Sequence, residues 1–85
     1  MNKIFHDKAW YEYLYWQDQD RKTLRRINEL INDIDKNGAL RGIGKPELLK
    51  GRKDISRRID EANRLIYLVI GDEIIVLACK GHYED

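Results

Sequence analysis

Hydrophobic residues change their spacing once along this chain. Between residues 24 and 34 they recur at intervals of three and four, the period of one helix face: Leu24, Ile27, Leu30, Ile31 and Ile34. From residue 65 onward they form two nearly continuous apolar runs, residues 65–70 and 74–79, joined by Gly71-Asp72. A two-residue turn between such runs is typical of a β-hairpin. The chain therefore combines a helical first half with a sheet-forming second half.

The N-terminal segment adds a strand and another helix. Residues 2–5 predict a short strand, and Asp7 is the expected N-cap of a helix over residues 8–17. The apolar and aromatic side chains of this helix recur at helical spacing, so we assign them to the core. The aromatic ones among them carry polar groups at their tips. These residues are Ala9, Trp10, Tyr13, Leu14 and Trp16.

The second helix should end at Asn37-Gly38, where glycine supplies the left-handed residue that commonly ends a helix. Residues 39–55 predict a loop, because three glycines and Pro46 are too dense for a helix or a strand. The expected strands that follow are residues 57–60, 65–70 and 73–79. The predicted fold class is α+β, with an N-terminal short strand and two helices packed on an antiparallel sheet.

Length and cysteine content restrict the kind of protein. At 85 residues the chain predicts a single domain, residues 1–85. Cys79 cannot form an internal disulfide, and the two histidines, His6 and His82, do not complete a zinc motif. We therefore expect no metal and no cofactor. Neither a signal peptide nor a membrane span is evident in the sequence, so the predicted location is the cytoplasm, with no membrane partner.

Positive charge is concentrated in the middle of the chain. Residues 41–58 contain seven basic residues against two acidic ones, whereas the whole chain has a net charge of +1. A basic segment on a nearly neutral protein favours a polyanion as the partner. A solvated loop rich in lysine would give the same composition, but this segment holds a glycine-proline loop and runs directly into a strand.

The end of the chain supplies a second chemical signal. His82 and Tyr83 follow the last apolar run, and the basic segment and three arginines precede it: Arg57, Arg58 and Arg64. Cleavage of RNA without a metal needs a base for the 2′-hydroxyl, cationic donors for the phosphate and an acid for the departing 5′-oxygen. These residue types are all present, so the sequence predicts a small ribonuclease.

Six segments in order resemble the RelE superfamily of toxin nucleases, and within it the YoeB/Txe branch. They span residues 10–83 and are residues 10–16, 26–31, 42–50, 56–59 and 63–67 and the terminal pair His82-Tyr83. The resemblance implies a microbial-ribonuclease-like fold, a type II toxin that cleaves messenger RNA in the decoding A site of the 70S ribosome, and neutralisation by a cognate YefM/Axe-like antitoxin. It is also compatible with a homodimer.

The resemblance also implies the site residues. Glu47 is the expected general base, Arg64 stabilises charge on the phosphate, and His82 is the general acid. Tyr83 completes the catalytic set by holding a base or sharing the proton transfer. Lys45, Lys50 and Arg58 are expected to contact the substrate, whereas Arg57 points to the opposite face of its strand and ranks lower.

Two other functions remain open from the sequence. The related ParE toxins share the helix pair and sheet and act on DNA gyrase, but they lack the combination of Glu47, Arg64, His82 and Tyr83. A binding module without catalytic turnover could use the same basic segment to hold RNA or a peptide. The nuclease hypothesis predicts that Glu47→Ala abolishes growth arrest with the fold intact, whereas a binding module would keep its effect.

Overall fold

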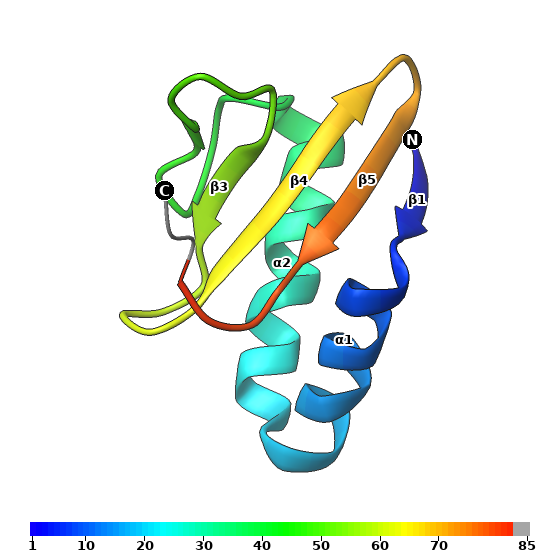
Figure 1. Ribbon diagram of the computed structural model, residues 1–85, viewed down its shortest axis with the longest axis vertical. Helices are drawn as coiled ribbons and strands as arrows, with labels where there is room; N and C mark the ends of the chain where they lie inside the picture. Colours follow the sequence, from blue (N-terminus) through cyan, green and yellow to red (C-terminus); the bar gives the residue numbers. More distant parts are fainter. Residues whose placement is uncertain (83–85) are drawn as a thin grey trace.

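The computed structural model describes residues 1–82, and these residues form two helices and five strands. In chain order the elements are β1 (Asn2–Phe5), α1 (Asp7–Gln19), α2 (Arg21–Asn37), β2 (Glu47–Leu48), β3 (Ile55–Arg58), β4 (Arg64–Ile70) and β5 (Glu73–Ala78). Figure 1 shows α2 crossing behind the sheet, with α1 running beside it from the end of β1. The predicted α+β class is confirmed. Within the described residues, neither helix is long and apolar enough to cross a membrane.

The five strands form one mixed sheet in the order β1-β5-β4-β3-β2. Strands β2 to β5 pair antiparallel, as predicted for β3, β4 and β5, and Gly71-Asp72 forms the expected hairpin turn between Ile70 and Glu73. Strand β1 differs, because it pairs parallel to β5, with Asn2 opposite Glu73. The two helices lie between β1 and the rest of the sheet in the sequence, and such a long connection allows a parallel neighbour.

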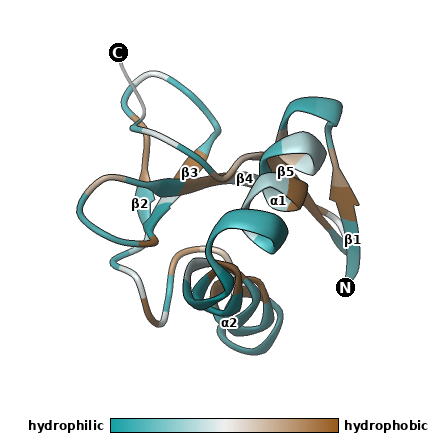
Figure 2. Cartoon of the chain, turned by 90° about the horizontal axis from the view of Figure 1, so that it is seen from below, coloured by the Kyte–Doolittle hydropathy of each residue, from teal (hydrophilic) through white to brown (hydrophobic). Residues whose placement is uncertain are grey.

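The core lies between the helices and one face of the sheet. Helix α2 contributes the apolar stripe predicted from its spacing, and strands β4 and β5 contribute Leu65, Tyr67, Ile74 and Val76, all fully buried. Figure 2 shows the outer side of α2 as hydrophilic and the middle of the sheet, around β4, as largely hydrophobic. In α1, Ala9 and Trp16 are buried, but Trp10 is 46% exposed and stacks on Tyr13. The assignment of Trp10 to the core was therefore wrong.

The predicted end of α2 is confirmed, whereas the predicted N-cap of α1 is wrong. Asp20 caps α2, since its carboxylate accepts hydrogen bonds from the amides of Lys22 and Thr23 at 3.1 and 3.2 Å. Gly38, with φ +97°, ends α2 as predicted. The N-cap of α1 is His6 and not Asp7. The chain is still extended at His6 as it leaves β1, so Asp7 becomes the first helical residue, where its carboxylate lies near the positive end of the helix dipole.

The segment predicted as a loop contains a short strand. Glu47 pairs with Ser56 and Leu48 with Ile55, which makes β2 the edge of the sheet. Strand β3 begins at Ile55, two residues earlier than predicted, and ends at Arg58. It ends there because the carboxylate of Asp60 accepts hydrogen bonds from the amides of Ala62 and Asn63, both at 2.8 Å, and bends the chain back into β4.

Candidate active site

The strand register places three predicted site residues on one face of the sheet. Glu47 is the register partner of Ser56, and Arg58 is the register partner of Arg64. Partners across a sheet share a face and faces alternate along a strand, so Glu47, Arg58 and Arg64 share one face. Leu65, next to Arg64, is buried under the helices. The three side chains therefore project from the face that the helices leave open, which we call the open face.

The carboxylate and the arginine of the proposed pair are separated by one strand. Strand β3 lies between β2 and β4, and Arg64 is two residues along β4 from Ile66, which is level with Glu47. With ordinary strand spacings, the Cα atoms of Glu47 and Arg64 are about 12 Å apart. Both side chains are long, so their charged ends can approach a common ligand above β3. The Glu47 side chain is exposed and that of Arg64 is half-buried.

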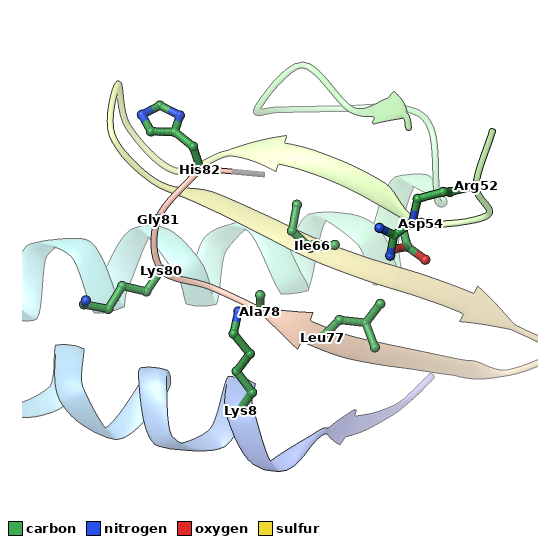
Figure 3. Close-up of a pocket in the computed structure, with 9 residues that line it drawn as sticks. All are labelled: Lys8, Arg52, Asp54, Ile66, Leu77, Ala78, Lys80, Gly81 and His82. Atoms are coloured by element: carbon green, nitrogen blue, oxygen red, sulfur yellow. The ribbon is translucent and has the colours of Figure 1, made fainter. Parts of the chain in front are cut away.

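His82 reaches the same face from the end of the chain. The residue before it, Gly81, accepts a hydrogen bond from the amide of Arg64 through its carbonyl at 3.0 Å. His82 also lines a pocket of about 290 Å³ on the open face, together with Ile66 and Ala78. Figure 3 shows His82 at one end of this pocket and Arg52 with Asp54 at the other. The fold therefore brings His82 beside the strand end that carries Arg64.

The other predicted residues lie around this face. Lys45 and Lys50 flank β2 on either side of Glu47, and both are exposed, as is Arg58. Lys45 has a φ of +51°, a left-handed conformation that turns the chain immediately before Pro46 and Glu47. Tyr83 lies outside the described residues.

The sequence indicated only part of the remaining pocket lining. Lys8 of α1 and Lys80 add positive charge to the pocket, and Arg52 forms an ion pair with the buried carboxylate of Asp54. The high basic content of residues 41–58 pointed to Arg52, but Lys8 lies far away in the sequence. Its spacing of four from Glu12, with an Nζ to Oε2 distance of 3.5 Å, indicates only a helix-surface pair.

Arg57 has a structural environment that the sequence analysis did not foresee. It lies on the helix side of β3 and is fully buried, so it does not add to the exposed basic surface. Its guanidinium donates hydrogen bonds of 2.6 to 2.9 Å to five acceptors: Asp33 Oδ2, the Tyr67 hydroxyl, and the carbonyls of Gly38, Arg41 and Ile43. Arg57 thus holds the loop that leads from α2 to Lys45 and Glu47.

Asp33 and Tyr67 complete this buried cluster. The hydrogen bond from Arg57 holds the pKa of Asp33 below its ordinary value, and Asp33 also accepts from the amide of Ile43 at 3.0 Å. The Tyr67 hydroxyl donates to the carbonyl of Ala39 at 2.6 Å, and burial raises its pKa. Together these contacts connect α2, the loop and the sheet, so the cluster stabilises the base of the loop that leads to Glu47.

A metal centre is not built into this part of the fold. Among residues 1–82, His, Cys, Asp and Glu side chains do not gather in any group of three that could hold a metal ion. Cys79 is buried, and burial raises the pKa of its thiol to about 12. The residues of the open face are instead a carboxylate, arginines, lysines and an imidazole. Such a set can move protons and stabilise negative charge on a phosphate.

Two helices on one face of a five-stranded sheet form a fold that this chain shares with solved structures of bacterial toxins. YafQ from Escherichia coli has this fold, with a TM-score of 0.77 and only 12% sequence identity over 95% of this chain and 92% of that chain. The likeness to YafQ shows the fold alone. The chain itself belongs to the family of YoeB-like toxins of bacterial type II toxin-antitoxin systems, whose family model matches residues 5–83.

Several members of this family are similar over their full length. Toxin YoeB of Escherichia coli K12 is 42% identical over 98% of this chain and 100% of its own length. Toxin RelK of Mycobacterium tuberculosis is 44% identical over 93% of this chain and 94% of its own. A structure of the YoeB dimer from Staphylococcus aureus superposes with a TM-score of 0.93 at 46% identity, covering 98% of both chains. The family resemblance predicted from the sequence is confirmed.

Proposed function

We propose that this toxin is a ribosome-dependent endoribonuclease that cuts messenger RNA in the decoding A site and so inhibits translation. The proposal is supported by membership of the YoeB-like toxins and by the side chains on the open face. The observation that carries it is the arrangement of Glu47, Arg64 and His82, which come from three distant segments and meet at one face. Core packing does not require a carboxylate, an arginine and an imidazole on these three segments.

The proposed reaction needs no metal. Glu47 accepts the proton of the 2′-hydroxyl, and the 2′-oxygen forms a bond to the adjacent phosphorus while the bond to the 5′-oxygen breaks. Arg64 donates hydrogen bonds to the phosphate oxygens as their negative charge increases. His82, in its protonated form, transfers a proton to the departing 5′-oxygen. The products are a 2′,3′-cyclic phosphate, or the 3′-phosphate after hydrolysis, and a fragment with a 5′-hydroxyl end.

The remaining basic residues would hold the substrate. Lys45, Lys50 and Arg58 are exposed and lie on or beside the strands that carry Glu47 and Arg64. In this proposal they contact phosphates on either side of the cleaved bond, which supplies affinity without sequence preference. Tyr83 would stack on a flanking base or share the proton transfer, as the family resemblance implies.

Two kinds of protein partner follow from relatives. A heterotetrameric YoeB-YefM toxin-antitoxin complex from Staphylococcus aureus contains a chain that is 46% identical to this one, with a TM-score of 0.92 and 98% of both chains covered. We propose that a YefM/Axe-like antitoxin binds this toxin and neutralises it by placing an acidic segment over the open face. A homodimer is proposed from the YoeB dimer of the same organism. A ribosomal substrate implies a cytoplasmic location.

The test is primer extension on a defined message bound to purified ribosomes, with toxin that has been stripped of bound metal by EDTA before it is added. The wild-type chain should cut within the A-site codon, and Glu47→Ala and His82→Ala should both abolish the cuts while retaining the native circular dichroism spectrum. Glu61→Ala, a change at an exposed carboxylate in the β3–β4 turn, is the matched control and should cut normally. Naked message should be cut poorly.

Other outcomes would point to other functions. Loss of cutting by EDTA-stripped toxin, with recovery after the toxin is reloaded with Zn²⁺ or Mn²⁺, would contradict a metal-free reaction. If folded wild-type protein cuts no message but inhibits DNA supercoiling by gyrase, the ParE-like alternative is correct. A related structure described as a YoeB/ParE toxin from Agrobacterium tumefaciens, at 34% identity and a TM-score of 0.93 over 98% of this chain and all of its own, makes the gyrase assay worth running.

A further inference from the structure

The segment that joins β5 to His82 is held by hydrogen bonds although it belongs to no strand. On the side of α1, the amide of Cys79 donates to Glu12 Oε1 at 2.8 Å, and Trp16 Nε1 donates to the carbonyl of Cys79 at 2.9 Å. The Cys79 thiol also lies 3.6 Å from the carbonyl of Ala9. These contacts fix where the chain leaves the sheet, three residues before His82.

A second set of contacts holds the residue immediately before His82. The carbonyl of Gly81 accepts from the Arg64 amide at 3.0 Å, and the amide of Gly81 donates to Asn63 Oδ1 at 2.8 Å. Gly81 has a φ of +86°, so the chain turns there in a conformation that other residues rarely adopt. Both backbone groups of Gly81 are therefore bonded to the start of β4, where Arg64 lies.

The side chain of Asn63 is itself fixed in orientation. Its Nδ2 donates to both carboxylate oxygens of Asp60, at 3.1 and 3.2 Å. The same carboxylate accepts from the amides of Ala62 and Asn63, and the carbonyl of Asn63 accepts from the amide of Ile59 at 3.0 Å. Because the amide nitrogen of Asn63 faces Asp60, its oxygen faces Gly81. The turn after β3 thus presents one acceptor in a defined place.

We propose that Asn63 is a positioning residue for His82. By binding the amide of Gly81, Asn63 sets the backbone position from which His82 presents its imidazole at the end of the pocket. This inference rests on the proposed role of His82 as the general acid. Asn63 is half-buried on a surface turn and does not belong to the core cluster, so its contact with Gly81 can be removed without opening the core.

The effect should appear in kcat and not in substrate binding. Asn63→Ala removes the acceptor for Gly81 but leaves the basic residues of the open face unchanged. Misplacing an acid by about 1 Å is enough to slow a reaction about 100-fold, so we expect kcat on ribosome-bound message to fall by about 10- to 100-fold. KM should stay within about twofold, because ground-state contacts to the RNA are retained.

A swapped double variant separates positioning from general stability. In Asp60→Asn combined with Asn63→Asp, the new amide at position 60 can still accept from the turn amides and donate to position 63. The new carboxylate at position 63 can still accept from Gly81. The double variant should recover kcat to within about threefold of wild type, whereas Asn63→Asp alone should stay slow, since it places two carboxylates together. Glu61→Ala is the control in the same turn.

A measurement independent of activity tests the contact itself. The amide of Gly81 should exchange with solvent about tenfold faster in Asn63→Ala than in wild type, with urea unfolding showing that the variant is folded. Unchanged kcat in Asn63→Ala, or a loss confined to KM, would overturn the inference. Failure of the proposed function is recognised separately, because wild-type protein would then cut no RNA. In that case faster Gly81 exchange in Asn63→Ala supports the fixing of the backbone before His82 by Asn63, and unchanged exchange overturns it.

Discussion

Removing the hydroxyl of Tyr67 is the most direct test of the buried cluster at the base of the loop that leads to Glu47. It donates to the carbonyl of Ala39 at 2.6 Å and accepts from Arg57 Nε at 2.8 Å, and the ring around it is fully buried. Tyr67→Phe removes only this oxygen and keeps the ring in place. The carbonyl of Ala39 and the Nε–H of Arg57 would then each lack a partner in the cluster.

The expected loss follows from these two bonds. A hydrogen bond between neutral groups contributes about 1 kcal/mol to stability, and one from a charged donor about 1.5–3 kcal/mol. We therefore expect Tyr67→Phe to lower the free energy of unfolding by about 3 kcal/mol. For a domain of this length each kcal/mol shifts the melting temperature by about 4–8 °C, so Tm should fall by about 12–24 °C.

Urea unfolding followed by tryptophan fluorescence measures this change, because Trp16 is buried next to the sheet. The midpoint should move to lower urea with an unchanged slope, since the surface exposed on unfolding stays the same. Tyr11→Phe is the matched control, because Tyr11 is 68% exposed and its loss should cost almost nothing. A loss below about 1 kcal/mol in Tyr67→Phe would contradict this expectation, because the cluster would then not depend on the hydroxyl.

Three further predictions test other parts of the fold. In Gly44→Ala the added Cβ would lie 2.7 Å from a core side chain of α2. This variant should therefore be less stable in urea than Gly51→Ala, where φ is similarly positive but the added Cβ meets open space. Equal losses of stability in the two variants would contradict the packing argument. Because Arg57 lowers the pKa of Asp33, this carboxylate stabilises the fold above its unfolded pKa of about 3.9 and ceases to do so as pH falls through its lower folded value. Asp33→Asn should flatten the dependence of stability on pH below about pH 4. An unchanged slope of stability against pH would count against the pairing of Asp33 with Arg57. The thiol of Cys79, with its pKa raised to about 12, should react with a disulfide reagent at about pH 8 only after the protein unfolds. Rapid reaction of the folded protein would show that the thiol is accessible.

Much of the fold could be predicted from local patterns. The apolar spacing of α2, its end at Gly38 and the hairpin at Gly71-Asp72 depend on residues close in the sequence, so periodicity and turn chemistry were sufficient. The errors fell where distant contacts decide. His6 rather than Asp7 caps α1 because β1 pairs with β5, and the two-residue strand β2 forms only because β3 offers it an edge.

Some features of the candidate site could likewise be predicted from local sequence, and others depend on distant contacts. The chemical types of the site could be assigned from the sequence, because Glu47, Arg64 and His82 lie in segments that the family pattern and local residue chemistry single out. Only the tertiary structure decided that Glu47 and Arg64 share a face, since a strand register shifted by one residue would have put them on opposite sides of the sheet. The buried state of Arg57 and the contact of Asn63 with Gly81 also depend on the tertiary structure. Both features depend on hydrogen bonds between segments that are remote in sequence, and the partners meet only when the sheet and helices pack.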